Sequence, residues 1–184
     1  MRLLLAILCV VTLGVTSSHA FTMDASSSTR FTLDVKRARI SQFVDDFSLL
    51  SRHFPGLVSI QAVGADTYVF VTEKSVPLSG KMRTEFTVKR RTIGDTLTVY
   101  ESPLPDMPNF MSCYVHIHPL GDAETDVAIE LRIRMTREKA GDFHWLAPVL
   151  GEKFLSEKMK DDIDDMLAHF VAGTKQEFTA ISRQ

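Results

Sequence analysis

His116 and His118 have the spacing that most directly suggests a metal site. In a β-strand, residues two apart project from the same face, so the two imidazoles could bind one cation. A strand-borne site of this kind needs a glutamate four residues after the second histidine, and Asp122 stands there instead. The apolar face of the same segment consists of Cys113, Val115 and Ile117. We therefore expect the histidines to face solvent and the protein to hold no metal.

The other chemical groups of the sequence have plain structural interpretations. Cys113 could be a nucleophile only with an activating base and a lowered pKa, and its aliphatic neighbours favour a small, inert, buried thiol. The acidic run lacks the glycine and the terminal glutamate of a calcium loop, so it indicates the solvated face of a helix. That run consists of Asp161, Asp162, Asp164 and Asp165. We expect no cofactor and assign no catalytic residue.

Polar groups that could act inside a cavity form a third set. If Leu97 and Val99 set the inward phase of their strand, Glu101 also projects inward, at the end of that strand. Glu101 is then either an orienting group at the cavity entrance or simply solvated there. Glu101, Tyr68 or a histidine could also serve as acid or base in an enzyme of the cyclase or hydrolase type.

The first 20 residues have the layout of a secretory signal peptide. Arg2 precedes an apolar run at residues 3–15, and Ser18 and Ala20 are the small residues before a cleavage point at Phe21. The apolar run is too short to span a bilayer comfortably, so we expect no stable membrane span after cleavage. A retained anchor is the alternative. The mature protein is expected in the periplasm or outside the cell.

Composition narrows the class of protein. The chain has 184 residues, 45% of them apolar and 24% charged, which is typical of one globular domain. This excludes a disordered acidic tail and a multi-span membrane protein. The formal net charge is -2, without the basic excess of a nucleic-acid binder, so we expect no nucleic-acid partner.

Apolar periodicity predicts an α+β domain over residues 30–184. Residues 21–29 show no periodic signal and predict a flexible tether, and residues 31–35 alternate as a strand. An apolar stripe at three- and four-residue steps predicts one helix over 40–54, which Pro55 and Gly56 end. Six further strands are expected at 57–63, 67–73, 81–89, 96–102, 111–118 and 127–135.

A final apolar stripe predicts a long helix over 155–170, which Gly173 either ends or weakens. A sheet of about seven antiparallel strands twists and curls, and the helix must bury its stripe against the concave face. If the sheet curves more than the helix fills, an apolar pocket remains between them. The order of elements therefore predicts a cavity for a ligand.

At this point the chain resembles the START-like superfamily, also called SRPBCC, helix-grip or polyketide cyclase/dehydrase-like. The resemblance rests on the opening strand 31–35, the helix 40–54, the Phe54-Pro55-Gly56-Leu57 junction, the run of strands and the terminal helix. It implies a helix-grip architecture of one strand, two helices, six strands and a final helix around a hydrophobic cavity. It also implies binding or transport of lipids, sterols, polyketides or plant hormones, and enzyme activity in a minority of members.

The resemblance also pairs the strand that carries Arg132 and Arg134 with the first strand, where Asp34 faces outward. Cross-strand ion pairs and a patch for an anionic lipid or glycan are the two interpretations of these arginines. Two apolar loops, 103–110 and 143–148, could gate entry to a cavity or could pack onto the core.

The candidate ligand-binding residues lie on the expected inner faces and at the expected cavity entrance. They are Tyr68, Phe70, Met82, Thr84, Phe86, Val99, Glu101, Cys113, Val115, Trp145, Met159 and Ile163. The sequence indicates an exported protein that holds a hydrophobic small molecule or lipid. The cyclase- or hydrolase-type enzyme and a protein-interaction module with a filled cavity are the alternatives, and the oligomeric state stays open.

Overall fold

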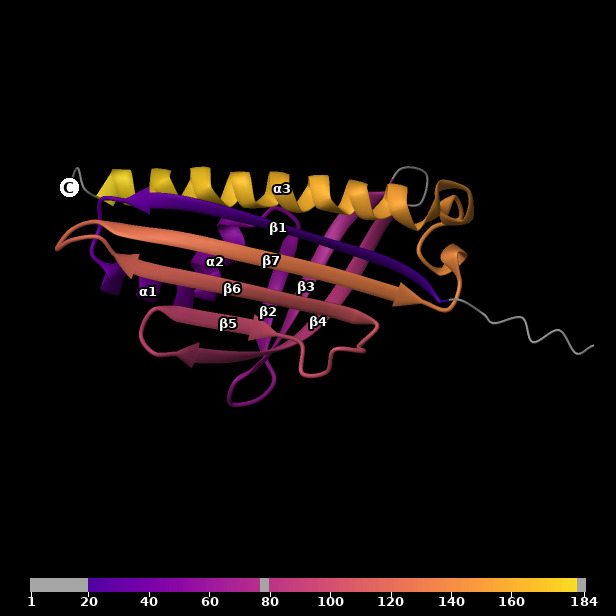
Figure 1. Cartoon of the computed structure of the whole chain (residues 1–184), viewed down its shortest axis with the longest axis horizontal. Helices are drawn as coiled ribbons and strands as arrows, with labels where there is room; N and C mark the ends of the chain where they lie inside the picture. Colours follow the sequence, from indigo (N-terminus) through magenta and orange to yellow (C-terminus); the bar gives the residue numbers. More distant parts are fainter. Residues whose placement is uncertain (1–19, 77–79, 182–184) are drawn as a thin grey trace, which may run out of the picture.

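The computed structural model describes residues 20–76 and 80–181. Over these residues the chain forms a seven-stranded antiparallel sheet in the order β1-β7-β6-β5-β4-β3-β2, with helices on one of its sides (Figure 1). The strands are β1 (Phe21–Leu33), β2 (Leu57–Ala62), β3 (Thr67–Val76), β4 (Gly80–Ile93), β5 (Leu97–Glu101), β6 (Asn109–Pro119) and β7 (Thr125–Arg137). The helices are α1 (Arg37–Asp45), α2 (Phe47–His53), α3 (Ala147–Ile181) and the short 3-10 helix η1 (Ala140–Asp142). The α+β helix-grip expectation is confirmed.

Strand β1 begins at Phe21, so the prediction of a flexible tether over 21–29 is wrong. It pairs with β7 in one unbroken register, from Phe21 opposite Arg137 to Leu33 opposite Thr125. The three consecutive serines interrupt the apolar alternation, so the sequence pattern does not indicate a strand here. The segment has no large apolar face, and its pairing with β7 stabilises it instead. The signal peptide predicted for residues 1–20 lies outside the described residues, except for Ala20.

Two helices follow β1, where the sequence pattern predicts one over 40–54. Helix α1 ends at Asp45, and Asp46 then begins α2 by accepting hydrogen bonds from the backbone N–H groups of Ser48 and Leu49 on its side chain. Aspartate at this position caps a new helix and competes with continuation of the old one. The break leaves the apolar stripe intact, because Phe43, Val44 and Leu50 all remain buried.

Helix α3 is longer than the predicted 155–170 and continues through Gly173. Gly151 has a φ of 79° near its start, where the chain turns from the first helical residues into the long rod. The rod lies along β1 for most of its length (Figure 1). Side-chain and backbone bonds join the two elements: the Thr22 N–H donates to Glu152 Oε1 at 2.6 Å, and the Asp24 N–H donates to Ser156 Oγ at 3.1 Å.

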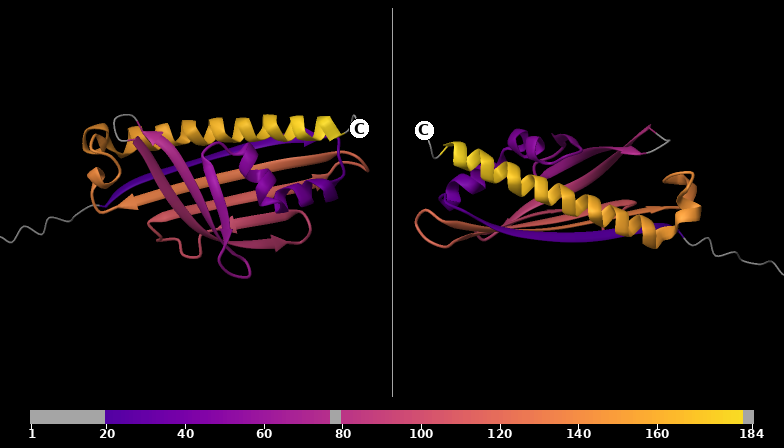
Figure 2. Two further views of the ribbon diagram at one scale, coloured as in Figure 1. Left: turned by 180° about the vertical axis from the view of Figure 1, so that it is seen from behind. Right: turned by 90° about the horizontal axis from the view of Figure 1, so that it is seen from above.

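The sheet is bent at β4. Residues Gly80 to Lys89 of this strand pair with β3, and Lys89 to Ile93 pair with β5. Strands β2, β3 and β4 therefore diverge from β1, β7 and β6, and α3 runs along the opening between the two arms (Figure 2). The hydrophobic core fills the space between the arms, α1, α2 and the buried stripe of α3.

Candidate functional site

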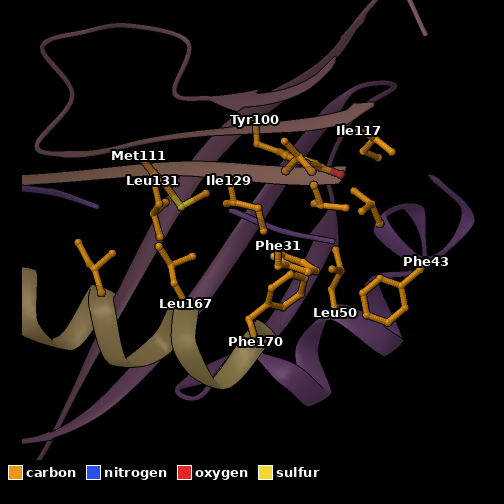
Figure 3. Close-up of a cluster of buried hydrophobic side chains, with 14 of the residues drawn as sticks. Phe31, Phe43, Leu50, Tyr100, Met111, Ile117, Ile129, Leu131, Leu167 and Phe170 are labelled. Carbon is orange, nitrogen blue, oxygen red and sulfur yellow. The ribbon is translucent and has the colours of Figure 1, made fainter. Parts of the chain in front are cut away.

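An interior hollow, here called the inner cavity, lies between the sheet and the three helices. Its volume is about 90 Å³. Its walls are Phe31, Leu33, Ile40, Phe43, Val44, Leu50, Phe54, Leu57, Phe70, Thr72, Tyr100, Met111, Cys113, Val115, Val127, Ile129, Leu131, Met166, Leu167, Phe170 and Thr174. None of these side chains carries a formal charge at neutral pH. Figure 3 shows Leu167 and Phe170 pointing from α3 toward Phe31, Ile129 and Leu131 of the sheet.

A second hollow, here called the outer groove, lies between α3 and the β3–β4 arm. Its volume is about 440 Å³. It is lined by Pro55, Gly56, Thr72, Glu73, Lys74, Ser75, Met82, Thr84, Phe86, Ile133, Met135, Met159, Asp162, Ile163, Asp165, Met166 and His169. Thr72 and Met166 line both hollows, so the outer groove adjoins the inner cavity at these two side chains. An ion pair between Lys74 and Asp162 joins β3 to α3 at the outer groove.

Three residues in the walls of the inner cavity carry hydroxyl groups, although the surface of the cavity itself is apolar. Thr72 Oγ1 donates to the Thr84 carbonyl at 3.3 Å. Thr174 Oγ1 is buried and has no hydrogen-bond partner in the described part of the chain, whereas the buried Tyr100 Oη lies beside the Arg90 guanidinium, which interacts with it. Tyr100 is 4% exposed and Thr174 is 1% exposed.

Burial alters the acid–base chemistry of the inner cavity. It raises the pKa of the Cys113 thiol to about 12, so the thiol stays protonated at neutral pH and is a poor nucleophile. Burial also raises the pKa of Tyr100, which keeps the phenol neutral and able to donate a hydrogen bond. The expectation of an inert thiol at Cys113 agrees with this shift.

The structure brings many of the sequence-predicted ligand-binding residues together. Phe70, Cys113 and Val115 line the inner cavity. The outer groove contains five more: Met82, Thr84, Phe86, Met159 and Ile163. Their roles in binding stay predictions, but their placement around adjoining hollows follows from the alternation of the strands and the stripe of the last helix.

The predicted inward phase of β5 is wrong. Tyr100, and not Val99 or Glu101, faces the inner cavity, because Tyr100 lies opposite Cys113 of β6 and both line that hollow. Val99 is buried on the other side of the sheet. Glu101 accepts from Tyr114 Oη at 3.1 Å and pairs with Arg91 at 2.8 Å on that other side, so it is neither an orienting group nor an acid of the inner cavity.

Two further candidates lie outside both hollows. Tyr68 is half-buried, and its ring centroid is 4.8 Å from that of Phe47. Trp145 precedes α3 and is 60% exposed. The two apolar loops, 103–110 and 143–148, contain both packed and exposed residues. Phe110 is buried beneath the Arg134 guanidinium and Phe143 packs on Phe21, whereas Leu104 is 59% exposed.

Sequence reasoning missed Tyr100 and Thr174 as cavity residues. All three central residues of β5 are buried, so burial does not tell which of them face the inner cavity. Only the pairing of β5 with β6 shows which side chains face inward. Thr174 comes after Gly173, beyond the predicted end of the helix. Continuing the helical period from Phe170 by four residues would have placed Thr174 on the buried stripe.

The other chemical groups have structural partners. His118 is exposed, and its ring stacks at 6.1 Å on that of His116, while no cluster of three metal-ligating residues occurs among residues 20–76 and 80–181. Arg132 forms a two-pronged ion pair with Asp24 at 2.9 and 2.6 Å, so its cross-strand partner is this residue and not Asp34.

The acidic run of α3 is only partly solvated. Asp161 and Asp165 are exposed, as expected. Asp162 pairs with Lys74, and Asp164 accepts hydrogen bonds from Ser27 Oγ and from Lys160 Nζ. Two members of the run therefore join α3 to the sheet. Within the described residues, no helix combines the length and apolar character that crossing a bilayer requires.

Comparison with known proteins places this geometry in one fold. No protein-family model and no curated protein matches the chain. A START superfamily protein from Mycobacterium smegmatis superposes with a TM-score of 0.60 at 13% identity, over 85% of this chain and 98% of that one. The Zhui aromatase/cyclase from Streptomyces sp. R1128 superposes with a TM-score of 0.55 at 13% identity, over 87% of this chain and 94% of that one.

A di-domain aromatase/cyclase, StfQ of the steffimycin biosynthetic pathway, is also similar. Its TM-score is 0.56 at 10% identity, over 88% of this chain, and this chain spans about half of it, 53%. Identities this low establish the fold alone. The superpositions cover most of this chain, and its bent seven-stranded sheet, paired helices after β1 and long closing helix form the START-like, helix-grip fold.

Proposed function

We propose that this protein is an exported binding protein for a hydrophobic small molecule or lipid. One observation carries the proposal: an uncharged inner cavity and a larger outer groove adjoin at Thr72 and Met166. Binding sites for small molecules are concave and mostly apolar, with a few polar groups that fix the ligand's orientation. The inner cavity is lined by an apolar surface, and the adjoining outer groove adds polar side chains, among them Lys74, Asp162 and His169.

The two volumes indicate how a ligand would lie. Sites for drug-sized ligands commonly measure about 300–1,000 Å³. The inner cavity, at about 90 Å³, holds only a small part of such a molecule, whereas the outer groove, at about 440 Å³, holds more. The ligand is therefore expected to insert one end past Thr72 and Met166 and to leave the rest in the outer groove. Lys74, Asp162 and His169 are charged or titratable side chains in the lining of the outer groove.

The similar structures support a ligand-binding role without specifying the ligand. One of them is named a START superfamily protein, and others are named aromatase/cyclases. A shared fold hosts many functions, so the argument for binding rests on the hollows of this chain and not on those names.

Native mass spectrometry tests the proposal directly. The chain from Phe21 onward is incubated with cell-envelope lipid extract, and bound masses are recorded after gentle desalting. We expect adducts on the unaltered chain and a loss of most of them in Thr72→Trp, which fills the junction of the two hollows. Thr92→Trp places the same bulk on an exposed site of β4 and should retain them. Only the bare mass, from several extracts, would contradict the proposal.

Export is the second part of the proposal, and the sequence of residues 1–20 supports it. N-terminal sequencing of the protein recovered from cells should read from Phe21. A chain that keeps Met1 and sediments with membranes would show a retained anchor instead.

A further inference from the structure

Exposed apolar side chains gather in one short segment at the start of α3, residues 145–154, here called the apolar turn. It holds four of the nine exposed large apolar side chains in the described residues: Trp145, Val149, Leu150 and Phe154. Val149 is the most exposed of the nine, at 81%. Single exposed apolar residues are ordinary on a protein surface, whereas a group of them in one place indicates an interaction site.

A buried alanine fixes which side of the apolar turn faces solvent. Ala147 is fully buried, and its N–H donates to the His144 carbonyl at 2.9 Å, so the chain already turns at Trp145. In a helical turn, the residues two before and two after a given position lie on the opposite side. Trp145 and Val149 therefore both project away from the core that Ala147 contacts.

The apolar turn also stands clear of the long rod of α3. Gly151, with a φ of 79°, turns the chain between Leu150 and the rod, and a Cβ at this glycine would meet no atom within 4 Å. Phe154 follows on the first turn of the rod and is exposed as well. The exposed side chains thus lie on both sides of a bend that has open space around it.

The described part of the chain begins next to the apolar turn. Phe21 packs on Phe143, with 5.6 Å between ring centroids, and the Thr22 N–H donates to Glu152 Oε1 at 2.6 Å. Figure 1 shows the start of β1 and the start of α3 at the same end of the molecule. The turn between β6 and β7 lies at the opposite end (Figure 1).

This location puts the apolar turn close to any membrane that the N-terminal segment enters. Residues 16–20 separate Phe21 from the apolar run at 3–15, and five residues of chain reach no farther than about 18 Å. While the predicted leader is attached and inserted, the apolar turn is therefore held near the bilayer surface. No other exposed apolar side chain of the described residues belongs to so dense a group.

The composition of the apolar turn fits a bilayer better than a second copy of the chain. Tryptophan is enriched where protein meets the membrane–water interface, because its ring is apolar and its N–H is polar. A stable dimer buries roughly 800 Å² per partner, and even a fully buried aromatic side chain covers only about 150–250 Å². Four partly exposed side chains, two of them aliphatic, fall short of such an interface.

The charges around the apolar turn indicate which kind of bilayer surface it fits. Lys153 lies 3.9 Å from Glu157, and Lys139 and Asp142 are both exposed on the preceding segment. Positive and negative groups therefore balance, and no basic patch is present at this end of the described chain to attract anionic lipids. The attraction comes from insertion of apolar side chains, which salt does not screen.

We infer that the apolar turn inserts into the surface of a zwitterionic lipid bilayer and holds the mature protein there after the leader is removed. Trp145, Val149 and Phe154 would lie at the level of the headgroups and the first acyl methylenes. The inference takes the location of the membrane from the export part of the proposed function. It concerns a surface outside both hollows, so it does not depend on whether a ligand binds there.

The fluorescence of the protein tests the inference directly, because Trp145 is its single tryptophan. The chain from Phe21 onward is titrated with phosphatidylcholine vesicles at low and at high salt. We expect the emission to move to shorter wavelength and to saturate at the same lipid concentration in both. Lipids brominated near the headgroup should quench the emission more than lipids brominated near the methyl end, because the turn stays at the interface.

A pair of variants with the same change of charge tests the residues. Val149→Asp combined with Phe154→Asp keeps the tryptophan and should weaken partition into the vesicles at least tenfold. Ile93→Asp combined with Leu120→Asp is the matched control, because these side chains are 51% and 57% exposed in turns at the opposite end of the molecule (Figure 1). The control should bind as the unaltered chain does. A Tm close to that of the unaltered chain in both variants excludes unfolding as the cause.

Several results would overturn the inference. One is an emission that does not respond to vesicles in the unaltered chain, and another is an equal loss of binding in the control pair. Sedimentation velocity without lipid supplies a third: a dimer that Val149→Asp with Phe154→Asp abolishes would show that a second copy covers the apolar turn. None of these results bears on the lipid adducts that test the proposed function, so the two can fail separately.

Discussion

Cys113 shows how burial controls a reactive group in this protein. Its thiol faces the inner cavity, and burial raises its pKa from 9.0 to about 12. At pH 8 the folded chain should therefore contain about a thousandfold less thiolate than the unfolded chain. Iodoacetamide labelling followed by intact mass should show a correspondingly slow reaction in buffer and a fast one in 6 M guanidinium. Comparable rates in the two states would mean that the thiol is open to solvent.

Because of the same burial, the fold should lose stability as the pH becomes alkaline. Burial raises the pKa values of Cys113 and Tyr100, so the unfolded chain releases these protons at lower pH than the folded chain does. Their contribution to stability is complete below about pH 9 and is lost as the pH rises toward 12, at up to about 1.4 kcal/mol per pH unit for each group.

Urea denaturation from pH 7 to 11 should show this decline, with a shallower slope in Cys113→Val. A free energy of unfolding that stays level or rises above pH 9 would contradict the assignment of both groups to a buried environment.

Gly173 allows the close approach of α2 to α3. A Cβ at this position would lie 2.4 Å from His53 Nδ1, and His53 is held in turn against Phe43, at 5.8 Å between ring centroids. Gly173→Ala should therefore destabilise the fold by about 1–3 kcal/mol through overpacking, although alanine favours a helix by about 1 kcal/mol.

A double-mutant comparison separates these effects. In a His53→Ala background the clash is gone, and the same Gly173→Ala change should stabilise the fold by up to about 1 kcal/mol. Greater stability of Gly173→Ala in the unaltered chain would show that the two helices do not touch here.

At the scale of elements, β1 depends on its bonds to β7. Because the N–H groups of Thr22 and Asp24 donate toward α3, alternation directs the Ala25 N–H toward β7 and the Ser26 N–H away from it. Ala25→Pro should therefore cost a buried ladder bond, about 1–3 kcal/mol, and Ser26→Pro clearly less. Urea midpoints measure the difference. If both proline variants lost equally little stability, residues 21–29 would be a flexible segment and not a paired strand.

The sequence pattern predicts the long, regular elements better than the segments that tertiary contacts decide. Strands β4, β6 and β7 follow from alternation because buried apolar side chains recur at every second residue over most of their length. Strand β5 is buried on both faces, so its phase depends on pairing with β6. The first part of β1 has small polar side chains, and the break at Asp46 arises from one capping side chain. In none of these three places does a strong apolar periodicity in the sequence indicate the structure that forms.

At the scale of the molecule, the bend at β4 creates the candidate site. The β3–β4 arm stands away from the rod that packs along β1, and the two hollows occupy the space between them (Figure 2). The existence of this space could be predicted from the number of strands and the one long helix. Its size, and the presence of Tyr100 and Thr174 in its walls, could not, because both depend on how tightly side chains from distant segments pack.

Methyl-group NMR of the chain from Phe21 onward, titrated with 4-butyltoluene, tests the claim that an apolar molecule enters between the sheet and α3. We expect the methyl signals of Ile129, Leu131 and Met166 to shift together with one dissociation constant. The exposed methyls of Val149, Leu104 and Val58 should stay in place. Shifts confined to the exposed methyls, or no saturable shift at all, would contradict the claim.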